Sequence, residues 1–374
     1  MGKSLIRFAA VLLAAALCIG CVTFAAGSET KETLRVGLFY GSTALPGANL
    51  ENSVGSGYRF GWYDDDLTFH QLGSSSETQI SVVKTQNVTL SGGNYVDGTG
   101  SVTVGCFHLQ LPTSYATFEE AQAAASTVSN GFPAWVEGTY YVRVGAYTSK
   151  EEALSAQTAL GLSNATVVGT SGYAVTVVVT KTGKPIFQFD GGQGYSLGIQ
   201  PGLDDSIKTV TWFKGYRYYG GFQYRRSGGN ITVINIVDLE DYIKGVLPYE
   251  MNNTWPLEAL KAQAVCARTY AATISSSHAS SVFDVCNNTH CQMYQGLNLA
   301  NDRTDQAVEE TAGEYVRYQG KPAVTYYSAS DGGATEDVRN IWDSTANLPH
   351  LKGVIDPYEA DLADSISQYN WTVT

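Results

Sequence analysis

The sequence predicts an α+β fold: a β-rich domain that carries one helical segment, together with a ferredoxin-like βαββαβ module. Three observations support this prediction. Short apolar–polar alternations separated by turn residues run through residues 34–103 and return from residue 172 onward. An internal repeat lies between Val104 and Thr170, and a helical period of apolar residues runs from Leu257 to Ile274. The length of 374 residues is enough for two or three domains.

The first strands are predicted between residues 34 and 103. The run LRVGLFYG at 34–41 alternates in the manner of a half-buried strand. The Gly- and Ser-rich residues 53–61, and the glycines at 92–93 and 98–100, mark turns. This N-terminal β region is therefore expected to consist of short strands joined by tight turns.

The internal repeat has two similar halves, CFHLQLPTSYATFEEAQAAASTV and YYVRVGAYTSKEEALSAQTAL. Each half is an alternating strand, a polar turn and an amphipathic helix with two glutamates in its first turn. Thr117 and Ser149 are natural N-caps for these helices, and the glutamates complement the helix dipole. Further strands are predicted at 133–137 and 165–169. The resulting order is βαββαβ, which gives one antiparallel sheet backed by two helices.

Strands are predicted again after Gly172, in YAVTVVV, PIFQFD, TVTWFKGYRYYGGFQYRR and NITVINIVD. A helix follows from Leu257 to Ile274, because one face of its helical period is apolar throughout. That face consists of Leu257, Leu260, Ala264, Ala267, Ala271 and Ile274. A last strand is predicted at 323–327, followed by a turn at the small residues 328–333.

Glu250 is the first candidate catalytic residue. It follows Pro248 in a short connection, after apolar Val246 and Leu247 and before the helix that begins at Leu257. A carboxylic acid in a partly apolar cleft can act as a general acid near neutral pH. The spacing alone favours the other interpretation, an exposed loop glutamate or a helix-capping acid. The residue types therefore leave both roles open.

Two histidines and two cysteines gather in a short polar segment, at His278, Cys286, His290 and Cys291. Imidazole and thiolate are the ligands that zinc takes in proteins. A Cys286–Cys291 disulfide, which an exported protein can form, and free thiols are the alternatives. Asp284 is a candidate hydrogen-bond partner for a ligating histidine.

The N-terminal residues 1–27 read as a secretory signal. Lys3 and Arg7 precede an apolar stretch from Phe8 to Ile19, which is too short to span a membrane. We expect cleavage near residues 25–27, with lipoprotein processing at Cys21 as the alternative. The protein is therefore expected to be exported to the cell envelope or the extracellular space, anchored to the membrane if Cys21 is lipidated.

The charge of the chain argues against a nucleic-acid partner. The formal net charge is −12, and only short basic runs such as Arg225-Arg226 occur. Neutralising phosphates needs clustered Lys and Arg side chains. No nucleic acid is therefore expected among the partners.

The repeat, and YYVRVGAYTSKEEA above all, resembles the SPOR domain, a peptidoglycan-binding module. The resemblance covers residues 104–170. It implies that this module binds glycan strands that have lost their stem peptides, with the sheet surface as the platform. A generic ferredoxin-like module is the alternative.

The segments GVLPYEM, PLEALKAQAVCARTYA, FDVCNNTHCQMYQG and TYYSASDGGATEDVRNIW resemble, in this order, the SpoIID/LytB family of sporulation cell-wall proteins. The resemblance implies a lytic transglycosylase. Such an enzyme cleaves the bond between N-acetylmuramic acid and N-acetylglucosamine in glycan strands without stem peptides and leaves a 1,6-anhydro end. It implies that Glu250 is the catalytic acid and base, ahead of the internal competitors Glu240 and Glu258.

The same resemblance implies the other site residues and the domains. A zinc ion is expected on His278, Cys286 and Cys291, with His290 as the alternative histidine. The residues expected to bind substrate are Arg268, Tyr270, Gln292, Tyr294, Ser328 and Ser330. Together with the signal pattern (1–27) and the SPOR-like module (104–170), the resemblance divides the rest of the chain into an N-terminal β region of the SpoIID-like part (34–103) and a catalytic domain (172–374). The last of these is expected to be truncated, because the chain ends where a strand begins.

A second class of function is also compatible with these residues. The chain would then be a non-catalytic protein that binds stem-peptide-free glycan and targets or activates a cell-wall amidase. Peptidoglycan glycan strands are the expected partner in both cases. Either function, glycan cleavage or amidase activation, is compatible with a role in sporulation and with a role in vegetative wall remodelling.

Overall fold

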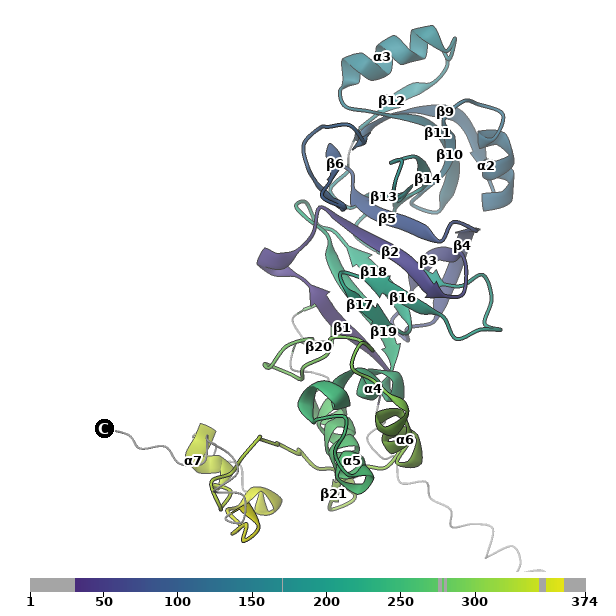
Figure 1. Cartoon of the computed structure of the whole chain (residues 1–374). Coiled ribbons are helices and arrows are strands. Elements are labelled where there is room, and N and C mark those ends of the chain that lie inside the picture. Colours follow the sequence, from purple (N-terminus) through teal and green to yellow (C-terminus); the bar gives the residue numbers. More distant parts are fainter. Residues whose placement is uncertain (1–30, 170, 275–277, 279–280, 343–347, 360–374) are drawn as a thin grey trace, which may run out of the picture. The chain divides into compact units, whose positions relative to one another are not determined.

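The computed structural model describes residues 31–169, 171–274, 278, 281–342 and 348–359 (Figure 1). They form two compact units. The larger consists of residues 31–315 with 324–327, and the smaller of the described residues in 316–323 and 328–359. The predicted signal segment with Cys21 and the last fifteen positions of the predicted catalytic domain, 360–374, lie outside the described residues. Within the described parts of the chain, no helix is long and apolar enough to cross a membrane.

The first sheet of the larger unit joins strands from both ends of the β-rich sequence. Its strands are β1 (Thr33–Phe39), β3 (Tyr58–Tyr63), β4 (Phe69–Ser75), β15 (Leu197–Pro201), β18 (Gly221–Arg225), β19 (Thr232–Asp238) and β20 (Val285–Cys286). Their order is β20-β1-β19-β18-β15-β3-β4. β1 pairs antiparallel with β19 and parallel with β20. The strands predicted in LRVGLFYG and NITVINIVD are thus confirmed and turn out to be neighbours.

A second sheet runs in the order β12-β9-β11-β10-β14-β13-β5-β2-β16-β17. Its strands are β2 (Gly47–Val54), β5 (Gln79–Lys84), β9 (Phe107–Tyr115), β10 (Gly131–Val136), β11 (Thr139–Tyr147), β12 (Thr166–Val168), β13 (Val175–Val179), β14 (Pro185–Asp190), β16 (Val210–Phe213) and β17 (Tyr216–Tyr218). The part from β9 to β5 curves strongly in Figure 1. A small antiparallel sheet of β6 (Val88–Ser91), β7 (Asn94–Asp97) and β8 (Thr103–Val104) lies against β2.

The elements between residues 107 and 168 follow one another in βαββαβ order, with α2 (Phe118–Ala125) and α3 (Lys150–Ala159) as the helices. Thr117 and Ser149 cap these helices, accepting hydrogen bonds from the backbone N of Glu120 and Glu152 at 3.2 and 3.1 Å, so both predicted caps are confirmed. β10 also pairs in parallel with β14, so this sheet continues into the neighbouring strands. The assignment of the module to the SPOR family stays a prediction.

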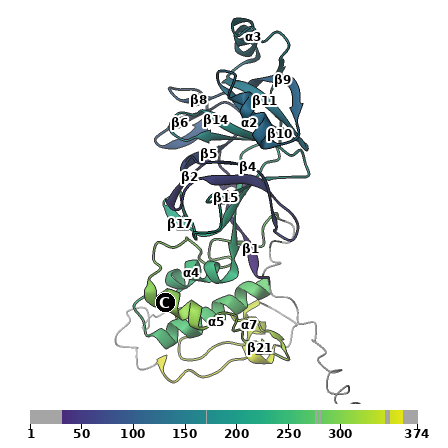
Figure 2. The ribbon, with the colours of Figure 1, turned by 90° about the vertical axis from the view of Figure 1, so that its right-hand side faces the viewer.

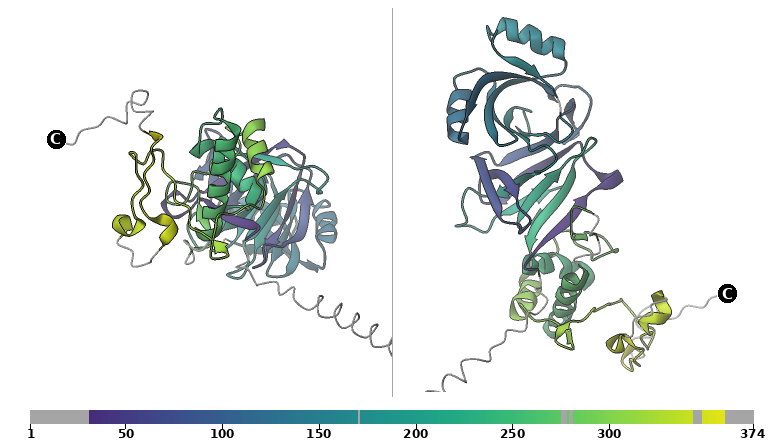
Figure 3. Two further views of the ribbon diagram at one scale, coloured as in Figure 1. Left: turned by 90° about the horizontal axis from the view of Figure 1, so that it is seen from below. Right: turned by 180° about the vertical axis from the view of Figure 1, so that it is seen from behind.

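One hydrophobic core lies between the two large sheets and extends to the helices. Phe60 of the first sheet and Phe187 of the second stack with 5.3 Å between ring centroids. The helices α4 (Leu239–Glu250), α5 (Leu257–Ile274) and α6 (Asp302–Glu310) pack against one another (Figures 2 and 3). The predicted bounds of α5 are confirmed. Its buried face includes Leu260, Ala264, Ala267 and Ala271.

The predicted strand at 323–327 is wrong, because this stretch forms no ladder. Side chains anchor it to the larger unit instead: the Thr325 hydroxyl donates to the carbonyl of Cys266 at 2.7 Å. The other short elements are η1 (Gly41–Thr43), β21 (Arg317–Tyr318), β22 (Lys321–Pro322), α7 (Val338–Trp342) and η2 (Pro349–Leu351).

His108 is a buried histidine through which acid is expected to destabilise the larger unit. The ring is buried, its Nδ1 lies 2.6 Å from the carbonyl oxygen of Gly145, and its Nε2 lies 3.1 Å from the amide nitrogen of Gln188. A neutral ring satisfies both bonds. Burial, with Arg143 adding to it, lowers the pKa of His108 from 6.5 to about 4.

Because the folded pKa lies below the unfolded one, stability is fully present above pH 6.5 and is lost as the pH falls towards 4. The loss amounts to at most about 3 kcal/mol. We expect urea unfolding to show a smaller drop between pH 7 and pH 5 in His108→Asn than in the wild type. The exposed His350→Asn serves as the control, and equal drops in all three proteins would contradict the prediction.

Candidate active site

Glu250 is the last residue of α4, so its predicted place in a connection is wrong. The Asp238 side chain caps the other end of the helix by accepting from the backbone N of Glu240 and Asp241. The helix continues through Pro248 in its last turn. Proline so near the end removes only one backbone hydrogen bond, and Pro248 is buried with its neighbours. Apolar burial therefore keeps the helical turn that carries Glu250.

The Glu250 carboxylate is held by two neighbours. The backbone N of Met293 donates to its Oε1 at 2.8 Å. Tyr327 is the second neighbour: burial raises the pKa of its phenol, and the Glu250 carboxylate raises it further. The phenol therefore stays protonated at neutral pH and keeps a proton to donate.

Gln292 orients this tyrosine. Its side chain is 1% exposed and donates to the Tyr327 hydroxyl at 3.0 Å and to the Ala267 carbonyl at 3.2 Å. Its carbonyl oxygen accepts from the Tyr242 hydroxyl at 3.2 Å. Gln292 thus connects α4, α5 and the segment 324–327 beneath Glu250. Tyr242 and Tyr327 were not predicted as site residues from the sequence, although Tyr327 stands in the segment TYYSASDGGATEDVRNIW.

Tyr270 is half-buried on α5. Its ring lies 5.7 Å from Tyr326 and 6.2 Å from Tyr327. Burial raises the pKa of Tyr270, and Tyr326, the two cysteines of the polar segment and Glu250 add to the effect. Tyr270 therefore lies near both Glu250 and the cysteines.

Arg268 lies inside the helical packing. Its side chain is 0% exposed, and its Nε and Nη2 donate to the two carboxylate oxygens of Glu240 at 2.8 and 2.6 Å. It also donates to the carbonyls of Val308 and Glu314. This bidentate pair holds α4, α5 and α6 together. The structure thus gives Arg268 a positioning role in this conformation.

Tyr294 is buried as well. Its hydroxyl donates to Oδ1 of Asn235 at 2.7 Å. A Cβ added to Gly245 of α4 would come within 2.4 Å of the Tyr294 ring, so glycine provides the space that this ring occupies. Tyr294 accordingly packs α4 against the loop that follows the cysteines.

The two competing glutamates are engaged elsewhere. Glu240 is neutralised by Arg268, and Glu258 is 82% exposed in an i,i+3 ion pair with Lys261. Among the described residues, no ion pair engages Glu250. Glu240 is also half-buried and accepts from the backbone N of Gly313 at 3.1 Å, but its carboxylate is paired with Arg268. Of the three, only Glu250 combines a backbone amide donor with no ion pair among the described residues.

The cysteines and histidines form one cluster. The ligand atoms of His278, Cys286, His290 and Cys291 all lie within 4.8 Å of one another. The Sγ atom of Cys291 is 3.4 Å from His278 Nε2 and 3.6 Å from His290 Nδ1, and Cys286 Sγ is 3.7 Å from His290 Nδ1. Both cysteines are free thiols. Hydrogen bonding, first of all from Cys291, lowers the pKa of Cys286 to about 4.

These separations fit a zinc ion. Tetrahedral coordination by sulfur and nitrogen at the usual bond lengths places neighbouring S and N ligands about 3.6 Å apart. His278 and His290 were predicted as alternative ligands. Both lie within reach here, because His290 presents Nδ1, the ring nitrogen nearer its backbone.

Asp284 has a different partner from the one predicted. Its carboxylate accepts from the side chains of Lys31 and Arg35 and from the backbone N of Arg35. These bonds lower its pKa against the effect of burial. Asp284 therefore fixes the cluster's loop to β1, next to the β1–β20 pairing.

Ser328 and Ser330 belong to the smaller unit. The Ser328 hydroxyl donates to the carbonyl of Ser330 at 3.0 Å, and the Ser330 hydroxyl donates to the Glu359 carboxylate. Glu359 also accepts from the backbone N of Asp331 and Gly333. Both serines thus stabilise a turn within that unit.

Comparison with known proteins identifies the segment that contains this site. Residues 227–318 match the SpoIID family, described as Stage II sporulation protein. This segment is similar to the SpoIID domain. The matched segment contains Glu250, Arg268, Tyr270, the Cys/His cluster, Gln292 and Tyr294, whereas Tyr327 and residues 104–170 lie outside it.

Individual proteins are also similar to parts of this chain. The chain is 43% identical over 141 residues to an uncharacterized protein of Brachyspira hyodysenteriae, covering 37% of this chain and 38% of that protein. It is 38% identical over 135 residues to the Amidase enhancer of Bacillus subtilis, covering 35% and 16%. It is 30% identical over 177 residues to Stage II sporulation protein D of Bacillus amyloliquefaciens, covering 43% and 47%. The matched segments thus span less than half of each relative.

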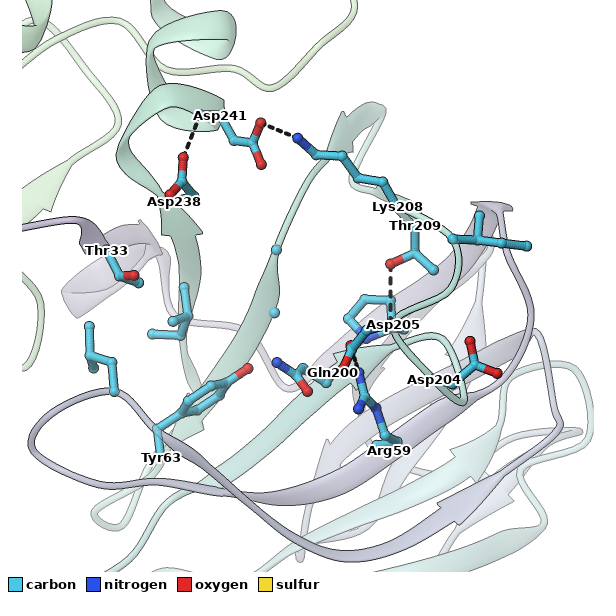
Figure 4. Close-up of a pocket in the computed structure, with 16 residues that line it drawn as sticks. Thr33, Arg59, Tyr63, Gln200, Asp204, Asp205, Lys208, Thr209, Asp238 and Asp241 are labelled. Atoms are coloured by element: carbon cyan, nitrogen blue, oxygen red, sulfur yellow. Dashed lines mark hydrogen bonds and ion pairs between the residues drawn. The ribbon is translucent and has the colours of Figure 1, made fainter. Parts of the chain in front are cut away.

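A polar cavity of about 430 Å³ lies at the end of α4 opposite Glu250 (Figure 4). Its two cations are paired, Arg59 with Asp205 and Lys208 with Asp241. The buried Tyr63 hydroxyl and Arg59 Nε have no hydrogen-bond partner among the described residues. No sequence pattern indicates this cavity, because strands far apart in the chain form it.

Gly221 limits the cavity on one side. A Cβ at this position would lie 1.9 Å from the Tyr63 hydroxyl and 3.0 Å from the Ile199 carbonyl. We expect Gly221→Ala to lower the free energy of unfolding by about 1–3 kcal/mol, because one of these groups must move. Gly229→Ala, where a Cβ meets nothing within 4 Å, is the matched control. Equal urea midpoints for the two variants would refute the expected clash.

Proposed function

We propose that this protein is a peptidoglycan lytic transglycosylase, with Glu250 as its acid and base. It cleaves the bond between N-acetylmuramic acid and N-acetylglucosamine in glycan strands without stem peptides. The observation that carries the proposal is the Glu250 carboxylate, held by the Met293 amide within the segment similar to the SpoIID domain while Glu240 and Glu258 are tied up in ion pairs.

A single carboxylate can perform both steps of this reaction. Glu250 first donates its proton to the glycosidic oxygen, and the bond from C1 of the muramic acid to that oxygen breaks. The C6 hydroxyl of the same sugar then bonds to C1 and gives its proton to the Glu250 carboxylate. Water does not enter, so the second carboxylate that glycoside hydrolases use is not required.

The neighbours of Glu250 orient this proton transfer. The Met293 amide fixes one carboxylate oxygen, and Gln292 fixes the Tyr327 hydroxyl nearby. A phenol that stays protonated can donate a hydrogen bond to an oxygen that becomes negative. We therefore assign Tyr327 to stabilising the carboxylate or a substrate oxygen. Tyr270 borders the same site, whereas Arg268 and Tyr294 position it from within the packing.

The Cys/His cluster is proposed to hold zinc through His278, Cys286, His290 and Cys291. Zinc with four protein ligands stabilises structure and presents no open position to a substrate. Met293 follows Cys291 by two residues, so a fixed cluster also fixes the amide that holds Glu250. The proposed role of the metal is therefore to order this loop.

The rest of the chain is proposed to act on the same material. Residues 104–170 would bind stem-peptide-free glycan, and the signal segment would export the protein to the cell envelope, where Cys21 is a candidate anchor. The names of the two Bacillus relatives, Amidase enhancer and Stage II sporulation protein D, support a role in sporulation or in cell-wall remodelling.

The test is glycan cleavage by the purified chain alone. Amidase-treated peptidoglycan, whose strands lack stem peptides, should release soluble fragments, and untreated peptidoglycan should release far fewer. Release from neither material would rule out the enzyme.

A second function is favoured by one observation, the similarity to a protein named Amidase enhancer. In that case the chain would bind glycan and stimulate a cell-wall amidase without cleaving anything itself. Adding the chain to an amidase on intact peptidoglycan would then speed stem-peptide release, and Glu250→Gln would speed it equally. Stimulation that Glu250→Gln abolishes would instead favour strand cleavage as its cause.

A further inference from the structure

A groove of about 600 Å³ lies on the larger unit, away from Glu250 in the sequence. Strands β2, β5 and β16 contribute its floor, and the hairpin between β6 and β7 contributes a wall. None of the residues that line it falls within 227–318 or 104–170. The groove is therefore separate from both the SpoIID domain match and the βαββαβ module.

The floor carries a row of three planar side chains. In the strand register Trp212 lies opposite Glu51, and Glu51 lies opposite Gln79, which places all three on one sheet face. The Gln79 amide donates to the Glu51 carboxylate at 2.8 Å. Trp212 is 41% exposed, whereas the core tryptophan Trp135 is 6% exposed. The Trp212 indole is thus accessible to a ligand. Beside it, the hydrogen bond between Gln79 and Glu51 holds both polar side chains in place.

The wall is fixed in place before any ligand arrives. The Asn49 amide donates to the Gly93 carbonyl at 2.7 Å, and the Lys214 ammonium donates to the Asn94 amide oxygen at 2.6 Å. The buried Tyr95 of the same hairpin donates to the Thr180 carbonyl at 2.9 Å. A pre-formed groove loses little conformational entropy on binding.

Two cations line the groove without a carboxylate partner. Lys214 is bonded to a neutral amide, and Lys181 is exposed. Within the described residues, no ion pair involves either of them. Both positive charges remain available to an acidic ligand.

These groups fit an acidic saccharide. An exposed indole takes the apolar face of a sugar ring, and neighbouring amide and carboxylate groups bind its hydroxyl and acetamido groups. Muramic acid without its stem peptide exposes a free lactyl carboxylate, which suits the two ammonium groups. We infer that this groove is a second glycan-binding site, specific for amino-sugar strands that bear carboxylates. That the ligand is a peptidoglycan strand rests on the proposed function, whereas the inference of a saccharide site rests on the residues of the groove.

The test is the affinity of the full chain for soluble oligosaccharides from amidase-treated peptidoglycan, with neutral chitin oligosaccharides as the comparison. Glu250→Gln is the background, so that cleavage does not interfere. Adding Trp212→Ala should weaken binding of both ligands at least about tenfold and remove part of the ligand-induced change in tryptophan fluorescence. Trp342→Ala, also at an exposed tryptophan, should change neither. Unchanged affinity in the Trp212 variant would overturn the site.

The lysines test the charge preference separately. Replacing Lys181 and Lys214 by alanine should weaken binding of the acidic strand but leave the chitin oligosaccharide almost unaffected. Equal loss for both ligands, or loss for neither, would overturn the preference for carboxylates. All these variants carry Glu250→Gln, and the experiment measures binding instead of cleavage. The result therefore does not depend on whether the protein is a transglycosylase.

Discussion

Replacing Glu250 by glutamine is expected to lower the rate of glycan cleavage by about 10²–10⁴-fold, the usual contribution of a general acid and base. The amide retains the acceptor oxygen for the Met293 N–H, so the fold should be preserved. It cannot donate and recover a proton at the glycosidic oxygen. The measurement is release of fragments from amidase-treated peptidoglycan, followed over time at equal protein concentration.

Two further glutamates provide the controls. Glu258→Gln removes an exposed partner of Lys261 and should retain wild-type activity. Glu240→Gln leaves the buried Arg268 without its carboxylate and should lower the melting temperature as well as activity. Activity in Glu250→Gln equal to that of Glu258→Gln would remove Glu250 from the mechanism.

Replacing Cys286 and Cys291 together by serine is expected to abolish zinc binding and lower the free energy of unfolding by about 4 kcal/mol or more, as loss of a structural metal does. Activity should fall too, because the same loop carries the Met293 amide. Metal analysis of protein purified without chelator should give one zinc per wild-type chain and none in the variant.

Cys266 provides the matched control, since it is a free thiol on α5 outside the cluster. Cys266→Ala should keep both the zinc and the activity. Mass spectrometry can detect a Cys286–Cys291 disulfide. Finding this disulfide and no zinc in the wild-type protein would contradict the metal site. Single His278→Ala and His290→Ala variants then report whether one histidine or both hold the metal.

Local sequence signals predicted the parts of the fold that local physics decides. Leu257–Ile274 has an uninterrupted apolar face, so both of its bounds were predictable. Thr117 and Ser149 cap their helices through contacts only three residues away. These elements need no knowledge of the rest of the chain.

Other features depend on partners far away in the sequence. Pro248 reads as a helix breaker, yet burial of its turn keeps Glu250 helical. The family resemblance implies that Arg268 binds substrate, but Glu240, 28 residues earlier, accepts its hydrogen bonds in the interior. The places of Tyr327 beside Glu250 and of Trp212 in the groove could not be predicted from the sequence either. Long-range packing of the chain brings these side chains into place.

The chemistry of the new chain end tests the account most directly. Amidase-treated peptidoglycan would be cleaved in water labelled with heavy oxygen and the fragments weighed by mass spectrometry. Intramolecular attack by the C6 hydroxyl predicts 1,6-anhydro ends, one water lighter than reducing ends and free of the label. Reducing ends that carry the label would show that water attacks C1, and would contradict Glu250 as the acid and base of a transglycosylase.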